Sequence, residues 1–434
     1  MSYNLRETLD RGPMSFNQWL AVAVCVLLSM LDGFDVLVMA FTASSVASDW
    51  QLSGSEVGML LSAGLLGMAI GSLFIAPLAD KIGRRTLTLY CLLLCASGMT
   101  FASFTQSMWQ LAAMRLLTGL GIGGILVCVN VISSEVSSLR WRALSVSLQS
   151  TGYALGATCG GLLAVWLMSI WGWRSVFFVG GLLSLAVIPL VLAFVPESLD
   201  FLLARRPKNA LERINKMAAR FGHPALNELP VAQAKTYQGN AVFQLWKPEL
   251  RRSTLVIWAS FFIVMFGFYF IMSWTPKLLV DSGMSTSEGV TGGVLLSIGG
   301  IFGSTVIGML AARIALKYVL QGYMLLSALL LVAFYGFASE LSYALALGLF
   351  IGFFSNGCVG GLYALTPQMY PATVRSTGLG WAIGVGRLGA ILSPVVAGVL
   401  LDFGWKPLNL YAVFALVFIA AIVVLALLPK SNAS

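Results

Sequence analysis

The chain has 434 residues, of which 58% are hydrophobic and only 10% are charged. A soluble protein usually carries roughly 25% charged residues, so this composition excludes a water-soluble fold. The formal net charge is +9. Because the basic residues gather in the loops on one side of the membrane, this charge reflects the orientation of the spans, and we expect no nucleic-acid partner.

Twelve apolar stretches are each long enough to cross a bilayer, which takes roughly 20 residues of helix. The first runs past the roughly 7–15 apolar residues of a signal peptide and contains two aspartates, so we expect an uncleaved span. We therefore predict an all-α integral membrane protein embedded in the lipid bilayer. In chain order the spans lie near 18–45, 56–80, 86–105, 109–133, 143–170, 174–195, 254–275, 289–312, 319–338, 342–366, 376–400 and 408–429.

The basic residues predict how these spans are oriented. Of the 26 Lys and Arg residues, 21 lie on the side that holds the N-terminus, three lie on the opposite side, and two fall inside spans. Loops rich in Lys and Arg face the cytoplasm. Both termini are therefore predicted to be cytoplasmic.

The chain contains an internal repeat. Residues 76–85 after the second span match residues 308–317 after the eighth, and residues 135–142 after the fourth match 368–375 after the tenth. Many transporters build a central site from such repeats. We predict a six-helix bundle over 1–195, a cytoplasmic linker over 196–252 and a second six-helix bundle over 253–434.

The linker has one patterned segment. Residues 200–221 place apolar side chains at helical spacing among six Lys or Arg residues. This pattern is typical of an amphipathic helix on a membrane surface. We expect it to act as a tether between the two bundles.

Two acids lie inside the first span. Asp32 and Asp35 are three residues apart, which puts them on one face of a helix near the middle of the bilayer. A carboxylate there costs several kcal/mol unless it is paired, hydrated or protonated. We interpret both as proton-coupling residues; the alternative is a fixed ion pair to Arg115 that only holds the first and fourth spans together.

Two cations also lie inside spans. Arg387 is near the middle of the eleventh span and Arg115 lies in the fourth. A guanidinium stays charged and binds a carboxylate through two parallel hydrogen bonds, which suits an organic anion. We take both as candidate substrate-binding residues, with Tyr363 and Trp381 as candidate stacking partners; Arg387 as a counter-ion to a protein carboxylate is the alternative.

A third group of charges lies at the cytoplasmic ends of the spans. Individually such pairs contribute roughly 0–1 kcal/mol, but several together can set the balance between two conformations. We expect them to form a charge latch that stabilises an outward-open state. The alternative is that they only mark the cytoplasmic side of the membrane, and Arg84 and Arg85 can do both. We group Asp80 with Arg84 and Arg85, and Glu135 with Arg142 and Arg375. The candidate gating residues are thus Asp80, Gly83, Arg84, Arg85, Glu135, Arg142 and Arg375.

These motifs resemble those of the major facilitator superfamily. The stretch Ala76–Arg85 is similar to the family's loop 2–3 motif, with Ala76 in place of its first glycine, and the stretch Arg115–Gly124 resembles its span 4 motif. The run Leu31–Asp35 is similar to the Asp-Gly-x-Asp signature of the aromatic acid:proton symporter family. The resemblance implies twelve helices in two pseudo-symmetric six-helix bundles and a bacterial inner membrane.

The glycine-rich part of the fourth span carries no nucleotide site. Gly119, Gly121, Gly123 and Gly124 have no strand before them and no Lys-Ser/Thr after them, so they predict close helix packing. The six cysteines lack metal-ligand spacing, and the one histidine, His223, lies in the linker. We expect no cofactor and no metal, and a proton gradient as the only energy source.

Taken together, the sequence predicts a transporter and no enzyme activity. The leading hypothesis is a proton-coupled symporter, active as a monomer, that imports a small organic anion; the resemblance makes that anion a benzoate or hydroxybenzoate. The alternatives are a symporter for an aliphatic acid or dicarboxylate such as muconate, and an organic-acid receptor. Export by proton antiport is disfavoured because Ala157 stands where drug antiporters of the superfamily carry proline.

Overall fold

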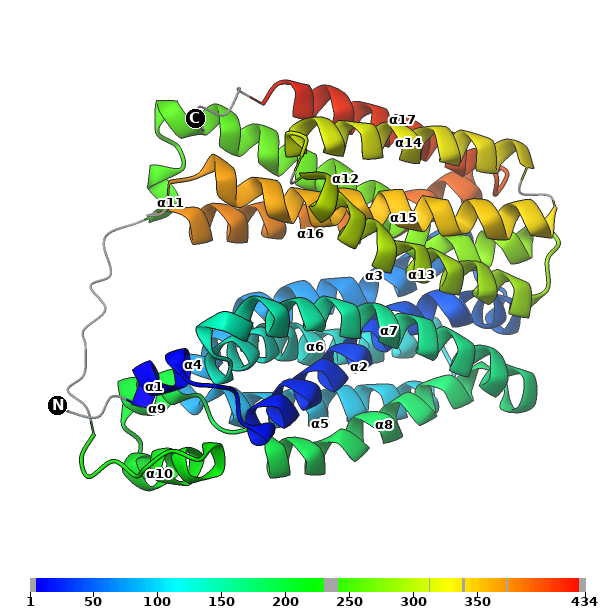
Figure 1. Cartoon of the computed structure of the whole chain (residues 1–434). Helices are drawn as coiled ribbons and strands as arrows, with labels where there is room; N and C mark the ends of the chain where they lie inside the picture. The colour runs from blue at the N-terminus through cyan, green and yellow to red at the C-terminus, as the bar shows by residue number, and fades with distance from the viewer. Residues whose placement is uncertain (1–4, 230–240, 312, 338–339, 372–373, 429–434) are drawn as a thin grey trace. The chain divides into compact units, whose positions relative to one another are not determined.

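The structure is a computed structural model that describes residues 5–229, 241–311, 313–337, 340–371 and 374–428. Its long helices are α2 (Phe16–Trp50), α3 (Gly54–Ile70), α5 (Arg84–Ala102), α6 (Met108–Val136), α7 (Leu139–Trp171), α8 (Trp173–Phe194), α12 (Pro248–Asp281), α13 (Thr286–Ala311), α14 (Leu316–Phe337), α15 (Leu341–Leu365), α16 (Arg375–Asp402) and α17 (Asn409–Ala426). The short helices are α1 (Leu5–Arg11), α4 (Ala79–Ile82), α9 (Leu199–Arg205), α10 (Ala210–Phe221) and α11 (Ala241–Gln244) (Figure 1).

Twelve helical segments of the described chain are long and apolar enough to cross a membrane. They match the twelve predicted spans one for one, so the protein is an all-α, multi-pass membrane protein. Several helices run past the predicted ends; the first extends over Phe16–Trp50 where the apolar pattern gave 18–45. Once a helix is nucleated, polar residues extend it beyond the hydrocarbon, because water then satisfies its last backbone groups.

The second span ends in irregular helix. A π-helical turn covers Gly71–Ile75 and a 3-10 turn covers Ala76–Leu78 before α4. Pro77 lacks a backbone N–H and cannot continue the α-helical ladder, which accounts for the change of helix type. Gly83 then turns the chain with φ of 100°, a conformation that favours glycine, and α5 begins at the next residue.

Glycines let the helices of the first half approach closely. A side chain added at Gly67 on α3, or at Gly71 in the π-helical turn that follows, would meet the backbone of Leu116 or Leu120 on α6. Contacts of this kind drive helix association where no hydrophobic effect operates between helices. The prediction that the glycines of the fourth span serve packing is confirmed, because Gly119, Gly121, Gly123 and Gly124 contact α3 or α5 or the turn after α3.

The same helix contact recurs in the second half. Gly299 and Gly303 on α13 meet the backbone of Leu349 and Phe353 on α15. These four positions lie 232 or 233 residues after their counterparts in the first half. The repeat seen in the loop motifs therefore extends to the helix packing.

The described chain divides into two compact units. The first unit consists of Met1–Val36, Leu66–Ala157 and Arg174–Thr236, and the second consists of Leu37–Leu65, Thr158–Trp173 and Tyr237–Ser434. These units are defined by contacts between residues, whereas the predicted bundles are defined by the sequence repeat. The bundle boundaries at 195 and 253 follow the repeat and stay a prediction.

Within the second unit, the start of α3 meets the end of α16. The backbone N–H groups of Gly54 and Ser55 donate to the carboxylate of Asp402 at 2.6 and 2.9 Å. Further along, the Ser62 hydroxyl donates to the Ile391 carbonyl at 2.7 Å. A carboxylate at a helix N-terminus pairs with amides that lack a partner in the helix and opposes the helix dipole favourably. These contacts explain why residues 37–65 group with the C-terminal helices.

The patterned linker segment folds as two helices, α9 and α10, and not as one. Both belong to the first unit, and the apolar face of α10 is buried by protein: Ile214 and Ala218 have no exposed surface. The expectation that this face lies in the membrane surface is therefore wrong for this conformation. Ser198 caps α9 by accepting a hydrogen bond from Phe201, and Gly222 ends α10 at φ of 80°.

Substituting Gly299 by alanine should destabilise the protein by about 1–3 kcal/mol, because the new methyl group would press on the Leu349 carbonyl. Gly308, on the same helix, is the matched control, since nothing lies within 4 Å of the position of a Cβ there. The check is the melting temperature of each variant in detergent. Equal melting temperatures for Gly299→Ala and Gly308→Ala would contradict the packing role.

Candidate functional site

Asp32 and Asp35 line one small cavity in the first unit, here called the aspartate cavity. Both side chains are buried, with 4% and 5% of the residue surface exposed. The cavity has a volume of about 20 Å³, which is room for about one water molecule. Its other walls come from α2, α5, α6 and α8, namely Leu28, Leu31, Leu92, Cys95, Met99, Thr118, Ile122, Ile125 and Ser184. The predicted common face of the two acids is observed.

Asp35 is bound to Arg115. One guanidinium nitrogen of Arg115 donates to the Asp35 carboxylate at 2.8 Å, and the other donates to the Asp35 backbone carbonyl, also at 2.8 Å. The two side chains are only 3% and 8% exposed. This ion pair joins α2 to α6, and it occupies the guanidinium of Arg115 with protein oxygens. The role of Arg115 as a substrate ligand stays a prediction.

Arg84 connects three helix ends at one end of the first unit. Its guanidinium donates to the Asp80 carboxylate at 3.1 Å and to the Ser198 hydroxyl at 2.5 Å, and it lies 3.6 Å from the Glu135 carboxylate. Ser198 in turn donates to Glu135 at 2.5 Å. We call Asp80, Arg84, Glu135 and Ser198 the span-end cluster. It joins the expected gating residues Asp80, Arg84 and Glu135 through Ser198, which the sequence reasoning missed.

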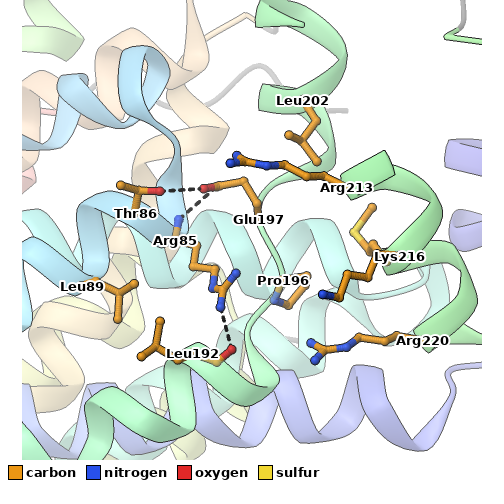
Figure 2. A pocket seen from close by; sticks show the side chains of 11 residues that line it. Arg85, Thr86, Leu89, Leu192, Pro196, Glu197, Leu202, Arg213, Lys216 and Arg220 are labelled. Atoms are coloured by element: carbon orange, nitrogen blue, oxygen red, sulfur yellow. Dashed lines mark hydrogen bonds between the residues drawn. The ribbon is translucent and has the colours of Figure 1, made fainter. Parts of the chain in front are cut away.

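Glu197 is a second residue that the sequence reasoning missed. Its carboxylate accepts hydrogen bonds from the backbone N–H of Arg85 at 3.0 Å and from the Thr86 hydroxyl at 3.3 Å, at the first turn of α5 (Figure 2). It would also meet any side chain added at Gly83. The glycine of the loop motif is thus required both by its positive φ and by the carboxylate beside it. The signal in the sequence is the Pro-Glu-Ser run that directly follows the sixth span.

Glu135 was expected to pair with Arg142 and Arg375, but the described residues give Glu135 and Arg142 other ion-pair partners. Arg142 forms its ion pair with Asp10 of α1, and its Nε donates to the Ser134 carbonyl at 2.9 Å. Glu135 lies at Arg84 instead. Helix α1 supplies this acid, which no loop motif indicated. The side chain of Arg375 lies outside the described residues.

In the second unit, Arg387 and Tyr363 lie close together. Arg387 is half-buried on α16, and its charge acts on the hydroxyl of Tyr363 on α15. The Tyr363 ring is 38% exposed and packs edge-on against Phe261, with ring centres 5.5 Å apart. A guanidinium pairs with carboxylates, and a partly exposed aromatic ring packs on other rings.

Trp381 has a protein partner of its own. Its ring stacks on Trp258 of α12 with centres 5.7 Å apart, and Trp246 packs edge-on against Trp258. Trp381 is nevertheless 47% exposed, so its role as a stacking partner for substrate stays a prediction. Trp274 on α12 is fully buried and donates to the Pro394 carbonyl at 3.1 Å, which is a packing role.

The described residues hold no group of three or more His, Cys, Asp or Glu side chains that could bind a metal ion. All six cysteines are free thiols, and five of them are buried.

Comparison with known proteins identifies relatives over nearly the whole chain. A family model described as Major Facilitator Superfamily matches residues 22–316 and 293–434. A "Gallate transporter" of Pseudomonas putida is 35% identical over 98% of this chain and 94% of its own, and a "4-hydroxybenzoate transporter PcaK" of Pseudomonas aeruginosa is 31% identical over 99% and 96%. Among solved structures, a D-xylose-proton symporter shares the fold with a TM-score of 0.73 at 15% identity, over 96% of this chain and 99% of its own.

Removing either partner of the Asp35–Arg115 pair should destabilise the protein by about 3–5 kcal/mol, because the remaining charge is buried without compensation. The double variant Asp35→Asn/Arg115→Gln should be more stable than either single variant. Melting in detergent measures the cycle, with Lys81→Gln as an exposed control. Additive losses in the double variant would show that the two residues do not act as a pair.

Proposed function

This chain belongs to the major facilitator superfamily, and we propose that it is a proton-coupled symporter that imports a small aromatic carboxylate. The observation that carries the coupling mechanism is the aspartate cavity, where two acids on one membrane-spanning helix line a space with the volume of about one water molecule. The aromatic substrate class is supported by the relatives, whose names give gallate and 4-hydroxybenzoate as their cargo.

Substrate binding is assigned to Arg387 and Tyr363. Arg387 would hold the carboxylate through two charge-assisted hydrogen bonds, and the exposed edge and face of Tyr363 would contact the aromatic ring. Trp381 is a further contact for the ring. Arg387 and Tyr363 both belong to the second unit, and the effect of the Arg387 charge on the Tyr363 hydroxyl supports a shared role.

A single carboxylate is favoured over two. The dicarboxylate alternative, such as muconate, needs Arg115 as a second anion ligand beside Arg387. In this conformation the guanidinium of Arg115 is occupied by Asp35 and 2% of the residue is exposed. A monocarboxylate needs only Arg387.

Protons are assigned to Asp32 and Asp35. A buried carboxylate in an apolar cavity is stable when it is protonated or paired, and Asp35 has Arg115 as its partner. Because the two acids share one cavity, binding of a proton at one of them would change the affinity of the other for a proton. No cofactor is required, because the proton gradient across the membrane supplies the driving force.

The gating role is assigned to the span-end cluster with Gly83, Arg85, Arg142 and Arg375. Ion pairs between partly exposed groups are weak enough to form and break during a conformational cycle. We place these residues at the cytoplasmic face of a bacterial inner membrane, with both termini inside, on the basis of the Lys and Arg distribution. The protein is proposed to work as a monomer.

Uptake by proteoliposomes tests the proposal. With an inward proton gradient, the purified protein should accumulate labelled 4-hydroxybenzoate, gallate or benzoate, and a protonophore should abolish the accumulation. Preferred accumulation of muconate would instead favour the dicarboxylate alternative. Saturable binding without accumulation would identify a receptor.

Replacing Asp32 or Asp35 by asparagine should abolish proton-driven accumulation while leaving exchange of labelled for unlabelled substrate across the membrane. The Asp35 variant should also be less stable, because Arg115 loses its partner. The amide cannot release a proton but keeps the shape of the side chain. Exchange, measured in the same vesicles, shows that each variant is folded, and Asp281→Asn on the exposed end of α12 is the control. Accumulation at the level of the unaltered protein in both variants would refute the proton role.

Replacing Arg387 by lysine should raise the KM for an aromatic carboxylate about tenfold or more, because one of two charge-assisted hydrogen bonds, each worth roughly 1.5–3 kcal/mol, is lost. The maximal rate should change less. Arg313→Lys, at an exposed position, is the matched control. An unchanged KM in Arg387→Lys would make Arg387 a structural residue.

A further inference from the structure

A large pocket unrelated to the aspartate cavity lies at one end of the first unit. Its volume is about 370 Å³, within the range of roughly 300–1,000 Å³ that small-molecule sites occupy. It is formed where the first turn of α5, the end of α8, and helices α9 and α10 meet (Figure 2). We call it the basic pocket.

Four cationic side chains line the basic pocket. Arg213, Lys216 and Arg220 lie on one face of α10, at spacings of three and four residues, and Arg85 faces them from α5 (Figure 2). The charges of Arg213 and Arg220 act on Arg85. Like charges gathered in this way repel one another. In the described part of the chain, none of the three α10 cations forms an ion pair with a carboxylate.

The one acid of the basic pocket is already engaged. Glu197 accepts hydrogen bonds from the backbone of Arg85, the hydroxyl of Thr86 and the backbone of Ser198. Its carboxylate therefore satisfies hydrogen-bond donors at the starts of α5 and α9 and forms no ion pair with the cations of α10 among the described residues. Arg85 is held in place by a 2.6 Å hydrogen bond to the Leu192 carbonyl, while its Nε is buried with no hydrogen-bond partner among the described residues. The charge of Glu197 also acts on Arg85, but with four cations and one acid in its lining the pocket keeps a net positive charge.

The opposite wall of the basic pocket is apolar and continues along the membrane-spanning helices. Leu89 lies in the second turn of α5 and Leu192 in the last turn of α8. Beyond them, Tyr90 and Leu93 on α5 and Leu185 on α8 are 42–61% exposed, as expected of side chains that face lipid. An occupant of this pocket would have its charged part among the cations and its apolar part along the spans.

We propose that the basic pocket binds the phosphate headgroup of an anionic phospholipid, with an acyl chain running along Leu89 and Leu192. A phosphodiester matches the positive charge, and the pocket lies at span ends, where headgroups are found. Inorganic phosphate or a sugar phosphate would satisfy the cations equally well, but would leave the apolar wall exposed. The lipid would tie α10, and with it the linker, to the ends of α5 and α8.

Titration of the full-length protein in detergent with dioctanoyl phosphatidylglycerol, followed by native mass spectrometry, tests this assignment. The unaltered protein should bind this lipid in preference to dioctanoyl phosphatidylcholine, and inorganic phosphate should not compete at equal concentration. The variant Lys216→Gln/Arg220→Gln should bind about 30-fold more weakly, since each basic residue near an anionic headgroup contributes roughly a fivefold factor.

The matched control is Lys208→Gln/Arg251→Gln, which removes the same charge from exposed positions outside the pocket. It should bind like the unaltered protein. An equal loss in this control would mean diffuse electrostatic attraction and would overturn the site. Competition by inorganic phosphate at equal concentration would assign the pocket to a soluble anion and would overturn the lipid. Both substitutions leave the buried face of α10 intact, so melting temperatures should not change.

Discussion

A charge inside a bilayer must be paired within the protein, because hydrocarbon offers neither water nor hydrogen-bond partners. Arg115 meets this requirement by binding both the carboxylate and the backbone carbonyl of Asp35. The pair fixes α2 against α6 and so defines the wall of the aspartate cavity. Asp32 lies in that same cavity, one helical turn away. The position of Asp35 is therefore set by a single cation on a neighbouring helix, and Asp32 shares its cavity.

Close helix packing supports this arrangement from two sides. The glycines of α3 and α6 bring backbones into contact, and Gly33 and Gly156 do the same where α2 meets α7. Since the α3–α6 contact recurs as α13–α15, the repeat supplies a common frame. The charged residues inside spans do not recur: Asp35 and Arg115 correspond to Phe268 and Gly348. Shared positions build the frame, and unshared positions give each half its own chemistry.

Much of this could be predicted from the sequence, and the failures have physical causes. Apolar runs predict spans because the membrane demands helices, and a three-residue spacing is enough to place Asp32 and Asp35 together. Ion-pair partners that are distant in sequence could not be predicted. A pattern of charged residues shows where a span leaves the membrane, but it does not show which charged residues contact one another. Arg142 therefore has Asp10 as its partner, not Glu135. For the same reason, the apolar face of α10 was expected against lipid, whereas protein covers it.

The contact between α3 and Asp402 differs from the Asp35–Arg115 pair in one respect that determines its use. Its groups are exposed, so water can replace the carboxylate at the amides of Gly54 and Ser55 with little loss of free energy. The buried pair has no such replacement. Hydration thus lets the helix start at Gly54 release and re-form its cap at the protein surface. The buried pair that joins α2 to α6 opens only when a proton takes the place of the cation at Asp35.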